Sequence, residues 1–195
     1  LLGMSKKERM KRAEEMGFDT DQTYYHGTAS DFDEFSLPED GRFSLHGKGV
    51  YFARDPSKVR FAEQGGGNVI PAHVRGRMGT RADRLDVERA LGPQLAGIGH
   101  GPRSELINSE MRSRGFAGYH AGDQAIVFDP SNIRSVNATF DPAKKDSSNL
   151  LAGATGASLL GGSLLGSDKA SASNRPPASM LGEAHPIKHP LLGEV

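Results

Sequence analysis

Short apolar runs separated by turn residues fill the chain from residue 23 to residue 140. The runs TYYHGT, GVYFA, NVIPAHV and AIVFD are rich in Val, Ile, Tyr and Phe and are bounded by Gly, Asp and Pro, a pattern typical of β-strands. Helices are predicted between them, at 56–64 and at 102–115, where Leu106, Ile107 and Met111 supply the apolar positions. This mixture of strands and helices suggests the α+β class.

Two segments of different composition flank this stretch. Before it, Ser5 and Glu8 form a capping-box pattern and Gly17 provides a helix stop, so residues 1–22 are predicted to be a short charged helix and a linker. After Phe140 the aromatic residues disappear and Gly, Ala, Ser and Pro dominate. We therefore expect residues 23–140 to be the folded domain and residues 141–195 to be a low-complexity tail whose removal leaves that domain folded.

One part of the tail, from Ser147 to Ser167, carries no charged residue. Its length matches a membrane span, which needs about 20 residues. Gly and Ser interrupt its Leu pairs, however, and most of its apolar residues are small. We expect a flexible or surface-docked tail here, with membrane contact of residues 147–167 as the alternative.

The overall charge and the lack of cysteine exclude several classes of function. The chain of 195 residues has 24 basic and 24 acidic residues, whereas a general nucleic-acid binder usually has a basic surplus. Without Cys there is no disulfide, thiol nucleophile or Cys-ligated metal, and the seven histidines show no metal-site spacing, so no metal is expected. The charged segment from Ser5 to Met16 is not a secretory signal, which favours a cytosolic protein. Because the chain opens on Leu1 rather than Met, we expect an internal fragment, a processed product, or a chain with extra residues before a native start at Met4.

Three strings contain the residues most suited to chemistry: YYHGT at 24–28, GKGVYFA at 47–53 and DQAIVFDPSNIRS at 123–135. Each has an ordinary explanation when taken alone. Tyr51 and its neighbours suit strand packing, and His26 suits a hydrogen-bonded core or surface histidine. Their order along the chain is what points to a shared site.

In that order the three strings resemble the His-Tyr-Glu branch of the ADP-ribosyltransferases, of the diphtheria-toxin and poly-ADP-ribose polymerase type. The resemblance covers about residues 24–136 and implies a core split into two β-sheets with flanking helices. It also implies NAD as substrate and a mono-ADP-ribosyltransferase that modifies an unknown acceptor, expected to be a host macromolecule. The chain looks most similar to a subgroup found in phage and prophage polyproteins and effectors. That subgroup implies a cytoplasmic protein or a virion protein delivered into the host cytoplasm.

The resemblance assigns roles to individual residues. His26 would hydrogen-bond the adenosine ribose, and the backbone of Gly27 would hold the nicotinamide carboxamide, with a further hydroxyl from Thr28. Tyr51 would stack on the cationic nicotinamide ring. Phe61 is the nearest candidate for the second aromatic residue that the family carries in the following helix.

The chain departs from the family at Gln124, where the family has an acid that stabilises the ribose cation. Three hypotheses follow: a transferase with weakened activity, an NAD- or ADP-ribose-binding module without catalysis, and a virion-associated structural component. Asp123 could replace the missing acid only from a loop, because neighbouring side chains in a strand point to opposite faces.

A local basic run at Arg75, Arg77, Arg81 and Arg84 could contact a pyrophosphate or an acidic partner. Asp83 and Asp86 are interspersed with it, which favours a solvated strand edge.

Overall fold

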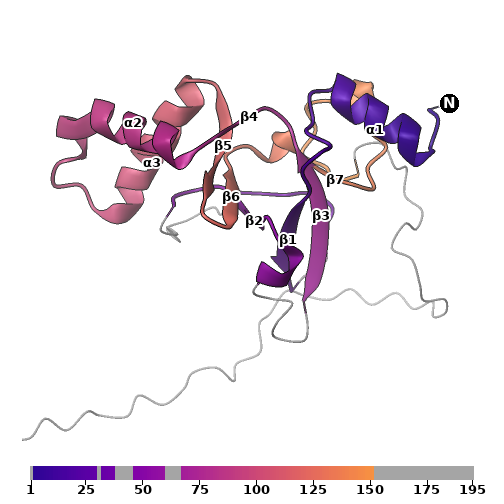
Figure 1. Ribbon diagram of the computed structural model, residues 1–195, viewed down its shortest axis with the longest axis horizontal. Coiled ribbons are helices and arrows are strands. Elements are labelled where there is room, and N and C mark those ends of the chain that lie inside the picture. The colour runs from indigo at the N-terminus through magenta and orange to yellow at the C-terminus, as the bar shows by residue number, and fades with distance from the viewer. Residues whose placement is uncertain (1, 30–31, 38–45, 60–66, 152–195) are drawn as a thin grey trace, which may run out of the picture. The chain divides into compact units, whose positions relative to one another are not determined.

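The computed structural model describes residues 2–29, 32–37, 46–59 and 67–151 (Figure 1). The α+β class predicted from the sequence is confirmed in these ranges. The strands are β1 (Tyr24–Thr28), β2 (Val50–Ala53), β3 (Asn68–Val74), β4 (Arg77–Gly79), β5 (Phe116–Ala121), β6 (Gln124–Val127) and β7 (Ile133–Ser135). The helices are α1 (Lys6–Glu15), α2 (Arg81–Leu91) and α3 (His100–Ser113), and short 3-10 turns lie at Pro56–Lys58, Gly92–Leu95, Pro130–Asn132 and Pro142–Lys144.

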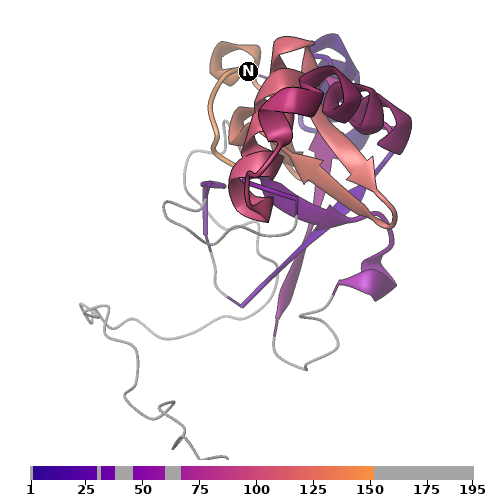
Figure 2. The ribbon, with the colours of Figure 1, turned by 90° about the vertical axis from the view of Figure 1, so that its left-hand side faces the viewer.

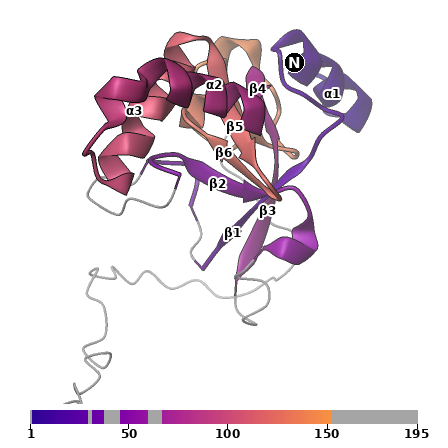
Figure 3. The ribbon, with the colours of Figure 1, turned by 60° about the vertical axis from the view of Figure 1, so that its left-hand side comes forward.

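The seven strands form one mixed sheet in the order β4-β5-β6-β2-β1-β3-β7. The expectation of two separate sheets is wrong for these strands, because Tyr25 of β1 pairs with Ala53 of β2 and joins the two halves. That is the one residue pair between β1 and β2, whereas β1 pairs with β3 from Tyr24 to Thr28 and β2 pairs with β6 along its full length. Figure 3 shows β1 and β2 diverging beyond this junction.

Helices α2 and α3 cover one face of the sheet over β5 (Figure 2). Apolar residues of both helices pack there on Tyr119 and Ile126, with Tyr51 at the edge of the cluster. The prediction of a strand edge for the whole basic run is wrong, because Arg81 begins α2. The hydroxyl of Thr80 and the carboxylate of Asp83 form a capping box at that helix start.

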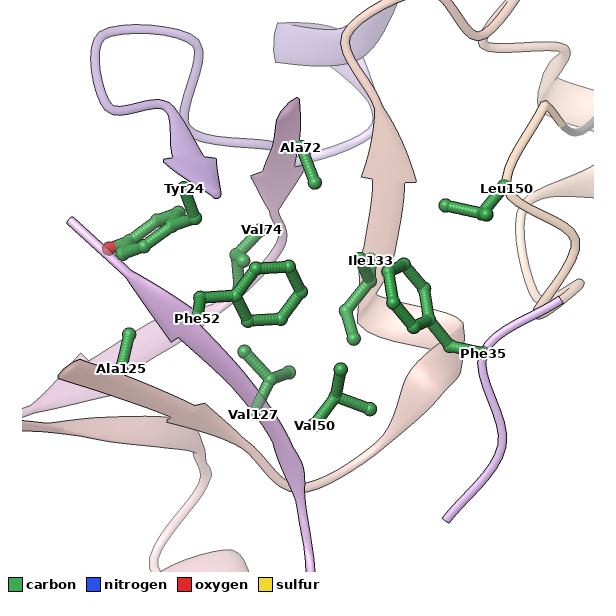
Figure 4. Packing of buried hydrophobic residues seen from close by; sticks show 10 residues of the cluster. All are labelled: Tyr24, Phe35, Val50, Phe52, Ala72, Val74, Ala125, Val127, Ile133 and Leu150. Carbon is green, nitrogen blue, oxygen red and sulfur yellow. The ribbon is translucent and has the colours of Figure 1, made fainter. Parts of the chain in front are cut away.

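The opposite face buries a second cluster, drawn in Figure 4. Strand β6 supplies both faces, because Ala125 and Val127 belong to this cluster while Ile126 between them packs under the helices. The cluster as a whole comprises Tyr24, Phe35, Val50, Phe52, Ala72, Val74, Ala125, Val127, Ile133 and Leu150. Strand β6 is therefore apolar on both sides.

Helix α1 docks on the segment that follows β7. Its capping box at Ser5 and Glu8 is confirmed, and Gly17 follows its end with a φ of 86°. Arg9 donates to the carbonyl oxygens of Val136 and Ala138, and Arg12 donates twice to that of Thr139. The N-terminal helix is thus part of the folded unit.

Residues 141–151 also pack on this unit, although the sequence assigned them to the tail. Leu150 is only 4% exposed, and its backbone N–H donates to the carbonyl of Asp33 at 2.8 Å. The buried Arg134 donates to the carbonyls of Lys144 and Lys145, which holds the chain against β7. We call residues 141–151 the strap. Packing therefore continues beyond residue 140. The strap has few apolar residues, and hydrogen bonds to Asp33 and Arg134 together with the burial of Leu150 hold it in place.

Some expectations fall outside the described ranges. The helix expected at 56–64 is described only to residue 59, as the 3-10 turn at Pro56–Lys58, and Phe61 lies outside the described residues. Most of the run from Ser147 to Ser167 does as well. Within the described ranges, no helix has the length and apolar character that crossing a membrane requires.

Candidate functional site

The candidate site lies where β1 and β2 separate. Beyond the Tyr25–Ala53 pair the two strands no longer form a backbone ladder, so polar groups of the main chain face each other across a gap. The side chain of His26 bridges this gap, with its Nδ1 2.8 Å from the carbonyl oxygen of Tyr51. The first two strings are thereby linked through a direct hydrogen bond.

His26 sits in an aromatic setting. Its ring meets those of Phe35, Phe52 and Phe32 edge to face, at centroid distances of 5.0, 5.6 and 5.8 Å. This burial lowers the pKa of His26, and the hydrogen bond to Tyr51 only partly opposes the shift. Because a carbonyl oxygen accepts and does not donate, Nδ1 carries the proton in the neutral ring. The neutral imidazole therefore presents Nε2 as a hydrogen-bond acceptor.

Tyr51 lies on the other face of the sheet. Its ring packs at the edge of the cluster under α2 and α3, and its hydroxyl donates to the carbonyl oxygen of Gly47 at 2.7 Å. Burial raises the pKa of the Tyr51 hydroxyl, and the nearby Tyr119 and Glu105 add to the shift. The phenol is therefore neutral across the physiological range.

Gln124 is the first residue of β6 and shares a face with Tyr51. It pairs with Ala53, and Tyr51 pairs with Ile126, so the two side chains are diagonal neighbours across the ladder. Diagonal neighbours of this kind lie about 7–8 Å apart. Gln124 is exposed, so its amide is accessible to a ligand.

Asp123 occupies the tight turn between β5 and β6. Ala121 pairs with Gln124, so Gly122 and Asp123 form a two-residue hairpin loop, in which Gly122 has a φ of 63°. A positive φ at the first of two turn positions is typical of a type II′ hairpin. Strand alternation therefore does not apply to Asp123. Asp123 and Gln124 both line the same cavity.

That cavity has a volume of about 470 Å³ and receives residues from all three strings. Among the described residues that line it, Lys58 is the only cation, and it comes from the 3-10 turn after β2. The lining consists of Tyr25, His26, Gly27, Tyr51, Phe52, Ala53, Lys58, Val59, Asp123 and Gln124.

A second hollow of about 380 Å³ shares His26 and Tyr51 with the first. Its other lining residues include Glu34, Phe35 and Ser36 from the segment before β2. Two adjoining hollows with His26 and Tyr51 common to both offer room for an extended ligand with two bulky ends. Both volumes lie in the range of small-molecule sites, about 300–1,000 Å³.

The structure thus brings together four of the predicted site residues, His26, Gly27, Tyr51 and Gln124. Thr28 instead pairs with Asn68 of β3 and lines neither of these two hollows. Sequence reasoning missed Lys58 as a lining residue, although the Asp55-Pro56 pair is a recognisable start for a short helix. It also missed Asn108 and Glu105 of α3, which hydrogen-bond the turn before β2. The sequence of a helix does not indicate which distant loop its side chains contact.

The described residues contain no group of three or more His, Cys, Asp or Glu side chains placed to hold a metal ion. The chemistry available at the cavity comes from a neutral histidine, a half-buried phenol ring, one ammonium, one amide and one carboxylate. Such a set can hold a polar ligand by hydrogen bonds and stack an aromatic ring. Comparison of the chain with family models, curated proteins and solved structures found no match to any of them.

Proposed function

We propose that the protein is an NAD-dependent mono-ADP-ribosyltransferase with its site in the cavity between β1 and β2. The observation that carries the proposal is the meeting of all three strings at one cavity, although they lie far apart in the sequence. The three strings supply the neighbouring strands β1, β2 and β6, so sheet pairing brings them together, and the support for a ligand is the cavity that these strands leave open.

The properties of the individual groups suit NAD. A neutral His26 with Nε2 as an acceptor is matched to a donor such as a ribose hydroxyl. Gly27 has no side chain, so a carboxamide can approach its backbone closely. The electron-rich ring of Tyr51 suits the cationic nicotinamide. The adjoining hollows give separate room to the two nucleoside halves of a dinucleotide.

In the proposed reaction, the bond between nicotinamide and ribose breaks and nicotinamide leaves with the bonding electron pair. The acceptor's nucleophile then forms a bond to the same ribose carbon and loses its proton. The positive charge that develops on the ribose requires stabilisation that is stronger in the transition state than in the bound substrate. Gln124 offers an acceptor oxygen without charge, and Asp123 offers the negative charge from the turn beside it.

The test measures nicotinamide release from labelled NAD and, on the same protein, NAD binding by calorimetry. We expect binding together with slow release, and we expect His26→Ala to weaken binding while His100→Ala does not. His100 is an exposed residue at the start of α3 that does not line this cavity, and it serves as the matched control. Absence of both binding and release at millimolar NAD would contradict the proposal.

A second candidate function is an NAD- or ADP-ribose-binding module without catalysis, which the amide at Gln124 favours. Binding without nicotinamide release, in the wild type and after Gln124→Glu, would support that candidate and reject the transferase. A protein that binds neither NAD nor ADP-ribose would leave the virion-associated component as the remaining hypothesis.

A further inference from the structure

The turn at residues 46–49, immediately before β2, is held by helix α3. The side-chain amide of Asn108 donates to the carbonyl oxygen of His46 at 2.9 Å and lies 3.5 Å from that of Lys48. The carboxylate of Glu105 accepts the backbone N–H of Lys48. Asn108 is fully buried. If one of its hydrogen bonds is lost, the polar group left behind has no water to replace the partner, which is costly.

The fit around Gly47 shows how close this contact is. Gly47 has a φ of 81°, and a Cβ placed on it would lie 2.7 Å from the amide nitrogen of Asn108 and 2.9 Å from a carboxylate oxygen of Glu105. A side chain at this position would therefore force α3 and the turn apart. The glycine allows the helix to approach the backbone directly.

The same turn carries the hydrogen-bond partner of Tyr51. The phenol hydroxyl donates to the carbonyl oxygen of Gly47, one residue from the carbonyls that Asn108 holds. A chain of direct contacts thus runs from α3 through the turn to the ring that borders both hollows. Arg84 of α2 completes the support, because it donates to the amide oxygen of Asn108 at 3.3 Å and pairs with Glu88.

We propose that Asn108 and Glu105 are positioning residues for the proposed reaction: by holding the turn at residues 46–49, they set the orientation of the Tyr51 ring against the ligand. The inference rests on the proposed function for its effect on NAD, while the contacts themselves concern only the protein. Neither residue lines the two hollows at His26, so any effect on NAD must pass through the turn, which contributes Gly49 to the second hollow, through Tyr51, or through stability.

Asn108→Asp is the sharpest variant. It keeps an oxygen for Arg84 and removes the donor to the carbonyl of His46. We expect it to weaken NAD binding on the order of tenfold, equivalent to about 1.4 kcal/mol. Ser109→Ala, at the next residue of α3 and exposed, is the matched control and should leave the affinity unchanged.

A double-mutant cycle with Tyr51→Phe separates positioning from a general effect on stability. Tyr51→Phe removes the hydroxyl and hence the link to the turn. If Asn108 acts through that link, adding Asn108→Asp to Tyr51→Phe causes little further loss. If the two losses multiply instead, the inference is overturned.

A readout independent of NAD comes from the NMR signals of the Tyr51 ring, assigned by their disappearance in Tyr51→Phe. We expect these signals to move in Asn108→Asp and not in Ser109→Ala, and unchanged signals would overturn the inference even if NAD binding falls. A wild type that does not bind NAD would reject the proposed function, and the ring signals would still decide the inference. If Asn108→Asp does not fold, Glu105→Ala, which removes the acceptor for the Lys48 N–H, takes its place in every arm.

Discussion

The Nδ1 of His26 donates a hydrogen bond to the carbonyl oxygen of Tyr51 at 2.8 Å, across the gap where β1 and β2 separate. A side chain here takes over the role of a missing ladder bond. Because Nδ1 is the donor, Nε2 of the neutral His26 ring is left as an acceptor. The same hydrogen bond fixes the orientation of the imidazole relative to the backbone of β2. The hydrogen bond thus connects β1 to β2 beyond their one paired position.

Replacing His26 by Ala should weaken NAD binding about ten- to a hundredfold, the equivalent of losing an interaction worth about 1–3 kcal/mol. The substitution removes both the bridge to Tyr51 and the acceptor nitrogen. Calorimetric titration measures the change, and circular dichroism reports whether the variant is folded. Wild-type affinity in a folded variant would show that His26 does not contact the ligand.

Gln124→Glu should raise NAD hydrolysis at least about tenfold, which corresponds to about 1.4 kcal/mol in the barrier. The new carboxylate would stabilise the ribose cation as it forms, so turnover should change more than affinity. Gln124 is exposed at the first position of β6, so the substitution disturbs no packing. Single-turnover assays of nicotinamide release provide the measurement.

Asp123→Asn tests the other acid at the cavity. If Asp123 supplies the charge, this variant should lose most of the wild-type release of nicotinamide while still binding NAD. If Asp123→Asn lowers nicotinamide release and Gln124→Glu does not raise it, Asp123 in the turn, and not residue 124, is the position that acts as the acid. Binding of NAD by all three proteins without nicotinamide release from any of them would favour the binding module.

Two truncations, one that removes the strap and one that begins after it, should separate the packed part of the C-terminal segment from the rest. Leu150→Ala should lower the free energy of unfolding by about 2–5 kcal/mol, because the side chain is only 4% exposed in the cluster with Phe35. Removing residues 141–195 should be at least as damaging, whereas removal of residues 152–195 should change little. Leu106→Ala, at a position 38% exposed, is the control in urea denaturation. Equal melts for both truncations would show that the strap contributes nothing.

Stability should fall as the pH drops from about 7.5 to 5.5. Burial lowers the pKa values of His26, His46 and His120, so the folded protein binds fewer protons than the unfolded chain. Their contribution is complete above the ordinary histidine pKa of about 6.5 and is lost as the pH falls through the lowered values. Urea midpoints at several pH values measure the effect, which His26→Gln should reduce and His100→Gln should not. A flat profile would contradict the prediction.

The sequence alone determined the local elements, because their signals lie within a few residues. Ser5, Glu8 and Gly17 mark both ends of α1, and the β-branched and aromatic runs mark β1, β2, β3 and β6. The start of α2 has an equally local signal, the capping box of Thr80 and Asp83. The arginines around it led instead to the prediction of a strand edge. The order of His26, Tyr51 and Gln124 along the chain also pointed to one shared site.

Only the tertiary structure decided how these elements meet. Whether Asp123 faces away from Gln124 depends on where the turn ends and the strand begins, and the pairing of Ala121 with Gln124 settles that the turn includes Asp123. The strap is held by carbonyl contacts to Arg134 and by the burial of Leu150, and its composition does not indicate either. The support that Asn108 gives to the turn before Tyr51 likewise joins residues far apart in the chain. Contacts of this kind depend on the path of the whole backbone, so no short stretch of sequence encodes them.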